Sequence, residues 1–226
     1  MTGEEAIIGV NIKVDKLATA SLPEIVPEVS VFWLNDAIAR IIKQRYGGNN
    51  PRKESFEETQ KRTDDLREVI EYQVIENPVA GFFANSVNFD LPEDYWFSVI
   101  EQVDIELPDC KGGIETDRVG VTAIQHNNIN AAAEKDPFWK PEAKDVLRVM
   151  QGNNTVVFHA PTTTVLKYYL GYIHNDFKID LNDLTAELKI ADHLHSEIVD
   201  LACSMILNAV ESGRYQQDLI ELSKSE

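Results

Sequence analysis

The chain has 226 residues, enough for one domain or for one domain with a sizeable insertion, and its composition is that of a globular protein. Its 38 acidic and 21 basic residues give a net charge of −17, which repels nucleic acid and anionic lipid and argues against a free DNA-binding protein. No apolar run approaches the roughly 18 to 20 residues that cross a bilayer, so we expect no membrane partner.

The two cysteines, Cys110 and Cys203, lie in unlike contexts, a polar turn and an apolar helical pattern. This usage predicts no disulfide framework and indicates folding in a reducing cytoplasm.

The first segment, residues 1–28, is predicted to be an irregular or part-stranded arm. Its apolar run at 7–12 is rich in β-branched residues, and Pro23 and Pro27 follow it.

Residues 29–76 are predicted to form a helical hairpin. The first helix starts near Ser30 and ends at the Gly- and Asn-rich stretch 47–50, because its apolar residues recur at three- and four-residue steps. A second helix is predicted over 55–74, where Ser55 and Glu58 have the spacing of a capping box.

Residues 77–175 are predicted to form a β domain, because the apolar pattern changes to period two and Pro, Gly and Asn clusters interrupt it. The candidate strands are 82–89, 95–107, 117–125, 145–150, 155–159 and 164–173.

Helical spacing returns at 192–211, so residues 176–226 are predicted to be a C-terminal helix and tail that pack on the hairpin. The fold class that follows is α+β: a helical bundle of N- and C-terminal helices with a central antiparallel β domain.

Catalytic patterns are scarce. His193 and His195 are the only close histidine pair, and two residues apart on a helix they face different directions, so they cannot share a metal. No nucleophile elbow or phosphate-binding loop motif occurs. Adjacent acids such as Glu57 and Glu58 leave a carboxylate-based hydrolase as an alternative, but such pairs arise by chance in an acidic chain. We therefore predict no enzyme, with no catalytic residues, no metal and no cofactor.

Charge is unevenly distributed. Between Arg40 and Arg67 there are eight bases and five acids, whereas residues 176–226 hold eleven acids and four bases. One interpretation is a solvated hairpin with i,i+4 ion pairs. The other is a charge-complementary contact in which the basic hairpin meets an acidic surface of a neighbouring subunit or partner.

The loop 137–141 places Phe138 and Trp139 between two prolines. These side chains either fold back onto their own domain or serve as anchors at a subunit interface, where large aromatic residues are enriched.

Several stretches together resemble a known family. They are Thr164–Ile173, Ile179–Leu181, the His195–Ala202 helix and Glu211–Tyr215, preceded in the N-terminal half by Phe32–Ala37, Phe56–Leu66 and Leu91–Tyr95. This succession resembles the ring or adaptor proteins in the neck of short-tailed crAss-like phages. The chain departs from the family pattern at Gly171 and at 175–177, where a basic residue and a proline are expected.

The resemblance implies a virion structural protein of the neck or tail, assembled as a ring of about twelve copies through heterologous contacts. It implies as partners the chain itself, the portal protein and other neck or tail ring proteins, with genomic DNA as a non-specific passenger in the lumen. Together with the charge and aromatic patterns, it nominates residues at a subunit or portal interface: Arg40, Lys43, Arg45, Lys61, Arg62, Phe138, Trp139, Arg214 and Tyr215. The alternative to a virion role is an acidic adaptor that binds one protein partner.

Overall fold

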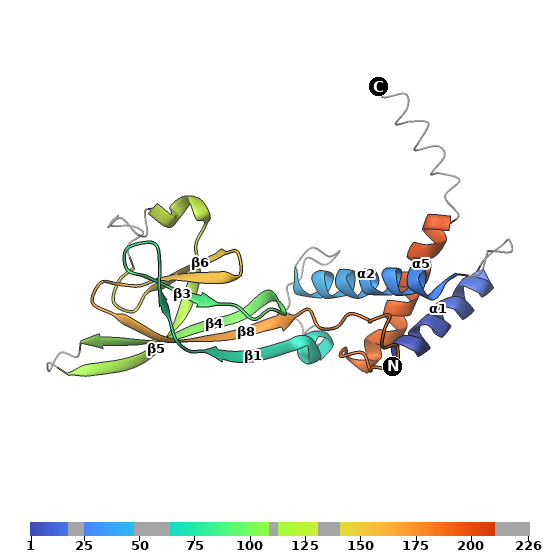
Figure 1. The fold of residues 1–226 in the computed structure, drawn as a ribbon, viewed down its shortest axis with the longest axis horizontal. Helices are drawn as coiled ribbons and strands as arrows, with labels where there is room; N and C mark the ends of the chain where they lie inside the picture. Colours follow the sequence, from blue (N-terminus) through green and yellow to red (C-terminus); the bar gives the residue numbers. More distant parts are fainter. Residues whose placement is uncertain (18–24, 48–63, 109–112, 131–140, 211–226) are drawn as a thin grey trace, which may run out of the picture. The chain divides into compact units, whose positions relative to one another are not determined.

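The structure, a computed structural model, describes residues 1–17, 25–47, 64–108, 113–130 and 141–210. The chain divides into two compact units: a helical unit formed by residues 1–69 and 176–226, and a β unit formed by residues 70–175. The α+β class is confirmed, with terminal helices packed together and an eight-stranded sheet (Figure 1).

The helical unit begins with α1 (Gly3–Leu17), where an irregular or stranded arm was predicted. That prediction is wrong because Thr2 and Glu5 form a capping box: the Glu5 amide donates to Thr2 Oγ1 at 3.2 Å, and the Thr2 amide donates to Glu5 Oε2 at 3.0 Å. Val10 and Val14 are then buried one turn apart. Tertiary packing thus overrides the strand preference of the β-branched run.

The second helix, α2 (Pro27–Tyr46), confirms the helix predicted from Ser30. Pro27 occupies the first turn, where its missing N–H costs nothing, and the Gly47 amide closes the last turn on the Lys43 carbonyl at 2.9 Å. The buried face is apolar apart from one serine: Ser30, Val31, Leu34, Ala37, Ile38, Ile41 and Ile42.

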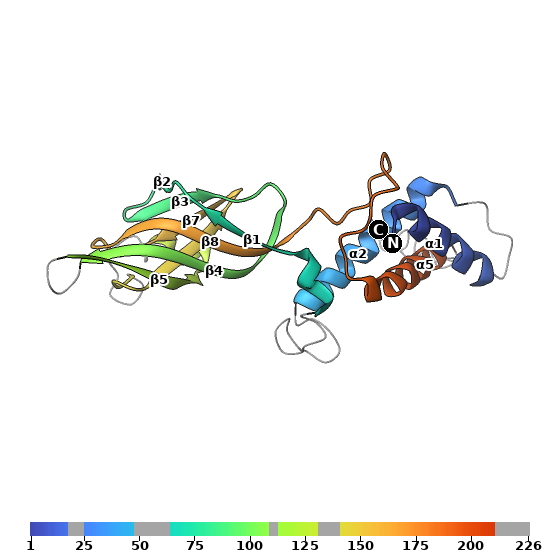
Figure 2. The ribbon, with the colours of Figure 1, turned by 90° about the horizontal axis from the view of Figure 1, so that it is seen from below.

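The C-terminal helix α5 (His195–Val210) follows the short helix η4 (Asp192–Leu194) and confirms the helix predicted at 192–211. Both α1 and α2 pack against α5, as Figures 1 and 2 show. α1 and α5 lie in direct contact at Gly9, where a Cβ would be in ordinary van der Waals contact with Val199 Cγ1 at 3.4 Å.

The prediction of a second hairpin helix over residues 55–74 is wrong over its last part. A short helix η2 (Arg67–Val69) leads directly into strand β1 (Ile70–Ile75), which pairs antiparallel with β8 (Thr164–His174). The predicted start of that helix lies outside the described residues.

The other six strands are β2 (Val79–Ala80), β3 (Ser86–Asp90), β4 (Tyr95–Pro108), β5 (Ile114–Ala123), β6 (Val146–Gln151) and β7 (Asn154–Phe158). A short helix η3 (His126–Asn128) follows β5. The strands predicted from alternation are thereby confirmed, although β3 begins only at Ser86. β1 and β2 were not predicted.

The sheet order is β1-β8-β4-β5-β6-β7-β3-β2, and the sheet curls around its core (Figure 2). Every pairing is antiparallel except that of β5 with β6, so the sheet is mostly antiparallel, as predicted. The core between the two halves of the sheet draws residues from five strands: Phe89, Val103, Ile105, Val146, Val157, Val165, Tyr168, Leu170 and Tyr172.

The two edge strands lie close together along the chain. Only three residues, 76–78, separate the end of β1 from the start of β2. Three residues span about 10 Å, so the curl brings the first and last strands of the order near each other without pairing them.

Candidate assembly surfaces

The three basic side chains nominated on α2 differ in exposure: Arg40 and Lys43 are exposed, whereas Arg45 is largely buried. Arg40 lies on the exposed face and pairs with Asp36 one turn earlier, with Nη2 to Oδ2 at 2.9 Å. Lys43 is also exposed. Both cations are therefore placed where a partner could reach them.

Arg45 has a different position. Its side chain is 14% exposed, its Nε donates to Asp65 Oδ2 at 2.7 Å, and its Nη2 contacts both carboxylate oxygens of Glu197 at 2.8 and 2.9 Å. Arg45 thus joins α2, the segment before η2 and α5 within one helical unit. Its donors are directed at its own chain, which weakens its nomination as an interface residue.

Asp65 is the centre of this network. Its carboxylate is fully buried and contacts a second group, His193 Nε2, at 2.6 Å. A buried carboxylate needs partners of this kind, because its desolvation is otherwise very costly. Nothing in the local sequence pattern distinguishes Asp65 from its neighbour Asp64 or marks it as buried.

The two histidines point to different partners, as their spacing predicted. His193 contacts Asp65, whereas His195 Nε2 lies 3.1 Å from the Ile190 carbonyl. Burial lowers the pKa of His195 below its ordinary value, and this outweighs the opposing effect of Asp192 at 3.6 Å. Among the described residues, no group of three or more His, Cys, Asp or Glu side chains is placed to hold a metal ion.

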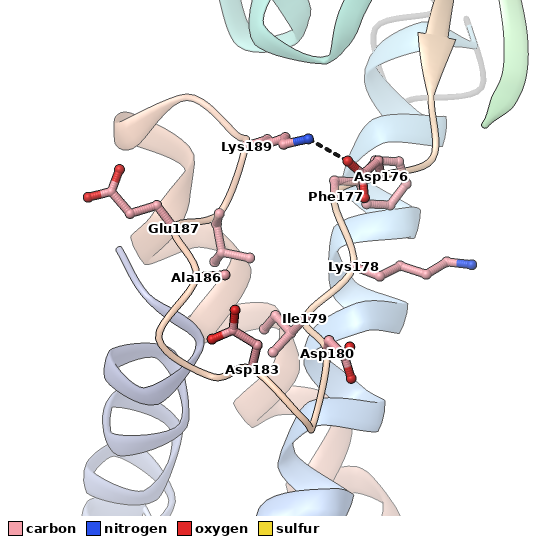
Figure 3. A pocket seen from close by; sticks show the side chains of 10 residues that line it. Asp176, Phe177, Lys178, Ile179, Asp180, Asp183, Ala186, Glu187 and Lys189 are labelled. Carbon is pink, nitrogen blue, oxygen red and sulfur yellow. Dashed lines mark hydrogen bonds and ion pairs between the residues drawn. The ribbon is translucent and has the colours of Figure 1, made fainter. Parts of the chain in front are cut away.

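A pocket of about 210 Å³ lies in the segment before η4, lined by residues 176–180, 183 and 186–189 (Figure 3). Its carboxylates hold the loop together: Lys189 pairs with Asp176, and Asp183 Oδ1 accepts from the Thr185 hydroxyl at 2.7 Å. The Thr185 contacts also lower the pKa of Asp183. These acids therefore have a local structural role in shaping the loop.

The outer face of the β unit carries a charged row. Arg118 forms a two-point contact with Asp104, at 2.8 and 3.2 Å, and stacks 3.7 Å above the Tyr169 ring centre. The Tyr169 hydroxyl donates to Asp104 at 2.7 Å. The hydrogen bond from Arg118 is the main reason why the pKa of Asp104 lies below its usual range.

Beside this row lies an apolar pocket of about 190 Å³. Its centre is a cross-strand row of Tyr72, Gly171 and Ile100, contributed by β1, β8 and β4. A Cβ at Gly171 would lie 2.5 Å from Ile100 Cγ2 and 2.8 Å from Tyr72 Cε1, so these two side chains occupy the space above the glycine. The family departure noted at Gly171 therefore falls in this pocket.

The remaining nominated residues, Lys61, Arg62, Phe138, Trp139, Arg214 and Tyr215, lie outside the described residues. Their interface role remains a prediction. None of the described helices has the length and apolar character that crossing a membrane requires.

The described residues thus present an α+β fold that carries exposed cations such as Arg40 and Lys43, and large exposed apolar side chains on both units. The model of one protein family, described as phage tail ring protein 3/4, matches residues 11–212. The chain therefore belongs to the crAss phage tail ring protein 3/4 family, a family of virion structural proteins. A comparison with curated proteins finds no match.

Proposed function

We propose that this chain forms a ring in the neck or tail of the particle, that the ring links the portal to the tail, and that the genome passes through its lumen. The family match over residues 11–212 carries the proposal, because a ring protein acts by associating with copies of itself. A ring of about twelve copies is expected from the resemblance described above.

The charge of the chain supports a channel role. DNA carries one negative charge per roughly 1.7 Å of helix axis, so a basic lumen would retain it through counterion release. A chain with a net charge of −17 can instead present a surface that repels the duplex and lets it slide. Exposed cations such as Arg40 and Lys43 would then face protein partners, namely the portal or another ring protein.

Particles assembled without this chain test the proposal. If the ring links portal and tail, DNA-filled heads should accumulate without attached tails, and the supplied wild-type chain should restore them. Complete, infectious particles made in its absence would contradict the proposed linkage.

Two basic residues outside the described part of the chain, Lys61 and Arg62, supply a finer test. Lys61→Glu combined with Arg62→Glu should lower incorporation of the chain into particles while the isolated chain keeps its circular dichroism spectrum. Unchanged incorporation would count against a charged contact at this segment.

A further inference from the structure

Exposed apolar side chains of the β unit are concentrated near its open edges. Among the described residues of this unit, the large exposed ones are Tyr72, Val74, Val79, Phe82, Ile100 and Ile114. All but Ile114 lie on β1, on β2 and the turn after it, or on β4 opposite Gly171. Large exposed apolar side chains that gather in one part of a protein surface favour an interaction site.

Phe82 is the most exposed of them, at 92%. It lies in the β2–β3 turn and contacts Phe83 edge-to-face, with ring centres 5.2 Å apart. Phe83 in turn packs on Phe158, a buried residue of β7, at 5.7 Å. The exposed aromatic ring is therefore supported by the core beneath it.

The turn itself is held by several contacts. The Gly81 amide donates to the Ser86 carbonyl at 2.9 Å, and the Ser86 hydroxyl donates to the Phe83 carbonyl at 2.7 Å. A Cβ at Gly81 would lie 2.1 Å from Ser86 Oγ, so only glycine fits there. A turn fixed in this way holds Phe82 outward before any partner binds, which lowers the entropy lost on association.

The pocket around Gly171 has complementary properties. It is lined by apolar and uncharged polar side chains: Tyr72, Gln73, Val74, Ile100, Gln102, Tyr169, Leu170 and Gly171. An uncharged lining matters in a chain of net charge −17, because two copies repel each other wherever their acidic surfaces meet. Interface cores are depleted of charge and enriched in aromatic residues.

We propose that Phe82 of one copy inserts into the Gly171 pocket of the next copy. This inference rests on the proposed ring. A closed ring needs heterologous contacts, in which one surface of a subunit binds a different surface of its neighbour. The Phe82 turn and the Gly171 pocket are two such different surfaces, one projecting and one recessed, on the same β unit.

A photo-crosslinking experiment on assembled particles tests the contact. A benzophenone-bearing phenylalanine analogue replaces Phe82, and particles are irradiated, denatured and separated by mass. We expect a covalent dimer of this chain whose joined peptides contain residue 82 and either 72–74 or 100–102. The same probe at Ile114, which is 76% exposed and away from the pocket, should not give that pair of peptides.

Substitutions provide the second readout. Phe82→Ser should reduce the amount of chain in particles at least about tenfold, as expected for a buried aromatic anchor, whereas Ile114→Ser should leave it unchanged. Ile100→Glu, which puts a charge into the pocket, should reproduce the loss. Circular dichroism spectra of the isolated variants establish that each one folds.

The outcomes separate this inference from the function on which it rests. If the wild-type chain is missing from particles, both fail. If the chain is present but the Phe82 probe yields no dimer, joins another protein or marks a different segment, the contact is wrong and the ring assignment stands. Normal incorporation of Phe82→Ser would also overturn the contact.

Discussion

The helical and β units differ in how they use their polar and apolar side chains. In the helical unit, Arg45, Asp65, His193 and Glu197 satisfy one another within the chain, around a carboxylate that solvent cannot reach. In the β unit, aromatic and aliphatic side chains such as Phe82 and Tyr72 are exposed on the surface. Because the charged side chains of the helical unit pair within their own chain, an excess of charge in a segment does not by itself identify an interface.

The largest expected effect in the helical unit comes from removing the buried carboxylate of Asp65. Asp65→Ala leaves Arg45 and His193 without their shared acceptor, and we expect a loss of about 3 kcal/mol in the free energy of unfolding, because Glu197 still neutralises Arg45. Urea denaturation measures this loss. Glu68→Gln, which alters an exposed acid nearby, should stay within about 0.5 kcal/mol of the wild type. Equal effects of the two variants would contradict the central role given to Asp65.

Two tyrosines on β8, Tyr168 and Tyr172, allow a matched test of hydroxyl groups in the β unit. The Tyr172 hydroxyl donates to Asp94 at 3.1 Å, whereas the buried Tyr168 hydroxyl lies near Thr155 but forms no well-aligned hydrogen bond among the described residues. Tyr172→Phe should therefore cost about 1 kcal/mol, and Tyr168→Phe should leave stability unchanged or slightly raised. The midpoints of urea denaturation rank the two variants by stability. A larger loss for Tyr168→Phe than for Tyr172→Phe would contradict the hydrogen-bonding roles given to the two hydroxyls.

The smallest expected effect is a pH dependence located in the helical unit. Because burial lowers the pKa of His195, the unfolded chain takes up this proton more readily than the folded chain. The contribution of His195 to the free energy of unfolding is therefore fully present above about pH 6.5, which is the pKa of histidine in the unfolded chain. This contribution declines as the pH falls below that value.

His195→Gln should consequently lose less stability than the wild type between pH 7.5 and pH 5.5, as followed by thermal unfolding. His126→Gln, at an exposed site in the β unit, is the matched control and should behave as the wild type does. An identical pH response in all three chains would refute the role given to burial at His195.

Strands and helices with strong periodicity could be predicted from the sequence. The alternation at 95–107 and 164–173 identified β4 and β8, and the three- and four-residue steps after Ser30 identified α2. α1 was missed although Thr2 and Glu5 have the spacing of a capping box. β1 was missed because its pairing partner lies about a hundred residues away, and helical spacing at Val69, Ile70 and Val74 competes with it.

The candidate assembly surfaces could be predicted less well from the sequence than the helices and strands. Lys43 and Arg40 were nominated because a charge excess is visible in composition, and the structure shows both side chains exposed on α2. The burial of Asp65 could not be predicted, since its neighbour Asp64 has the same side chain. Phe82 fell within a predicted strand, and its exposure follows from the Gly81–Ser86 turn contacts, which local sequence does not specify.

Reconstruction of the purified particle by electron microscopy, with density traced for this chain, tests most directly whether the chain forms a ring. We expect a closed ring of copies between portal and tail, with the genome path through its centre. Particles whose neck and tail density contains no copy of the chain would contradict it.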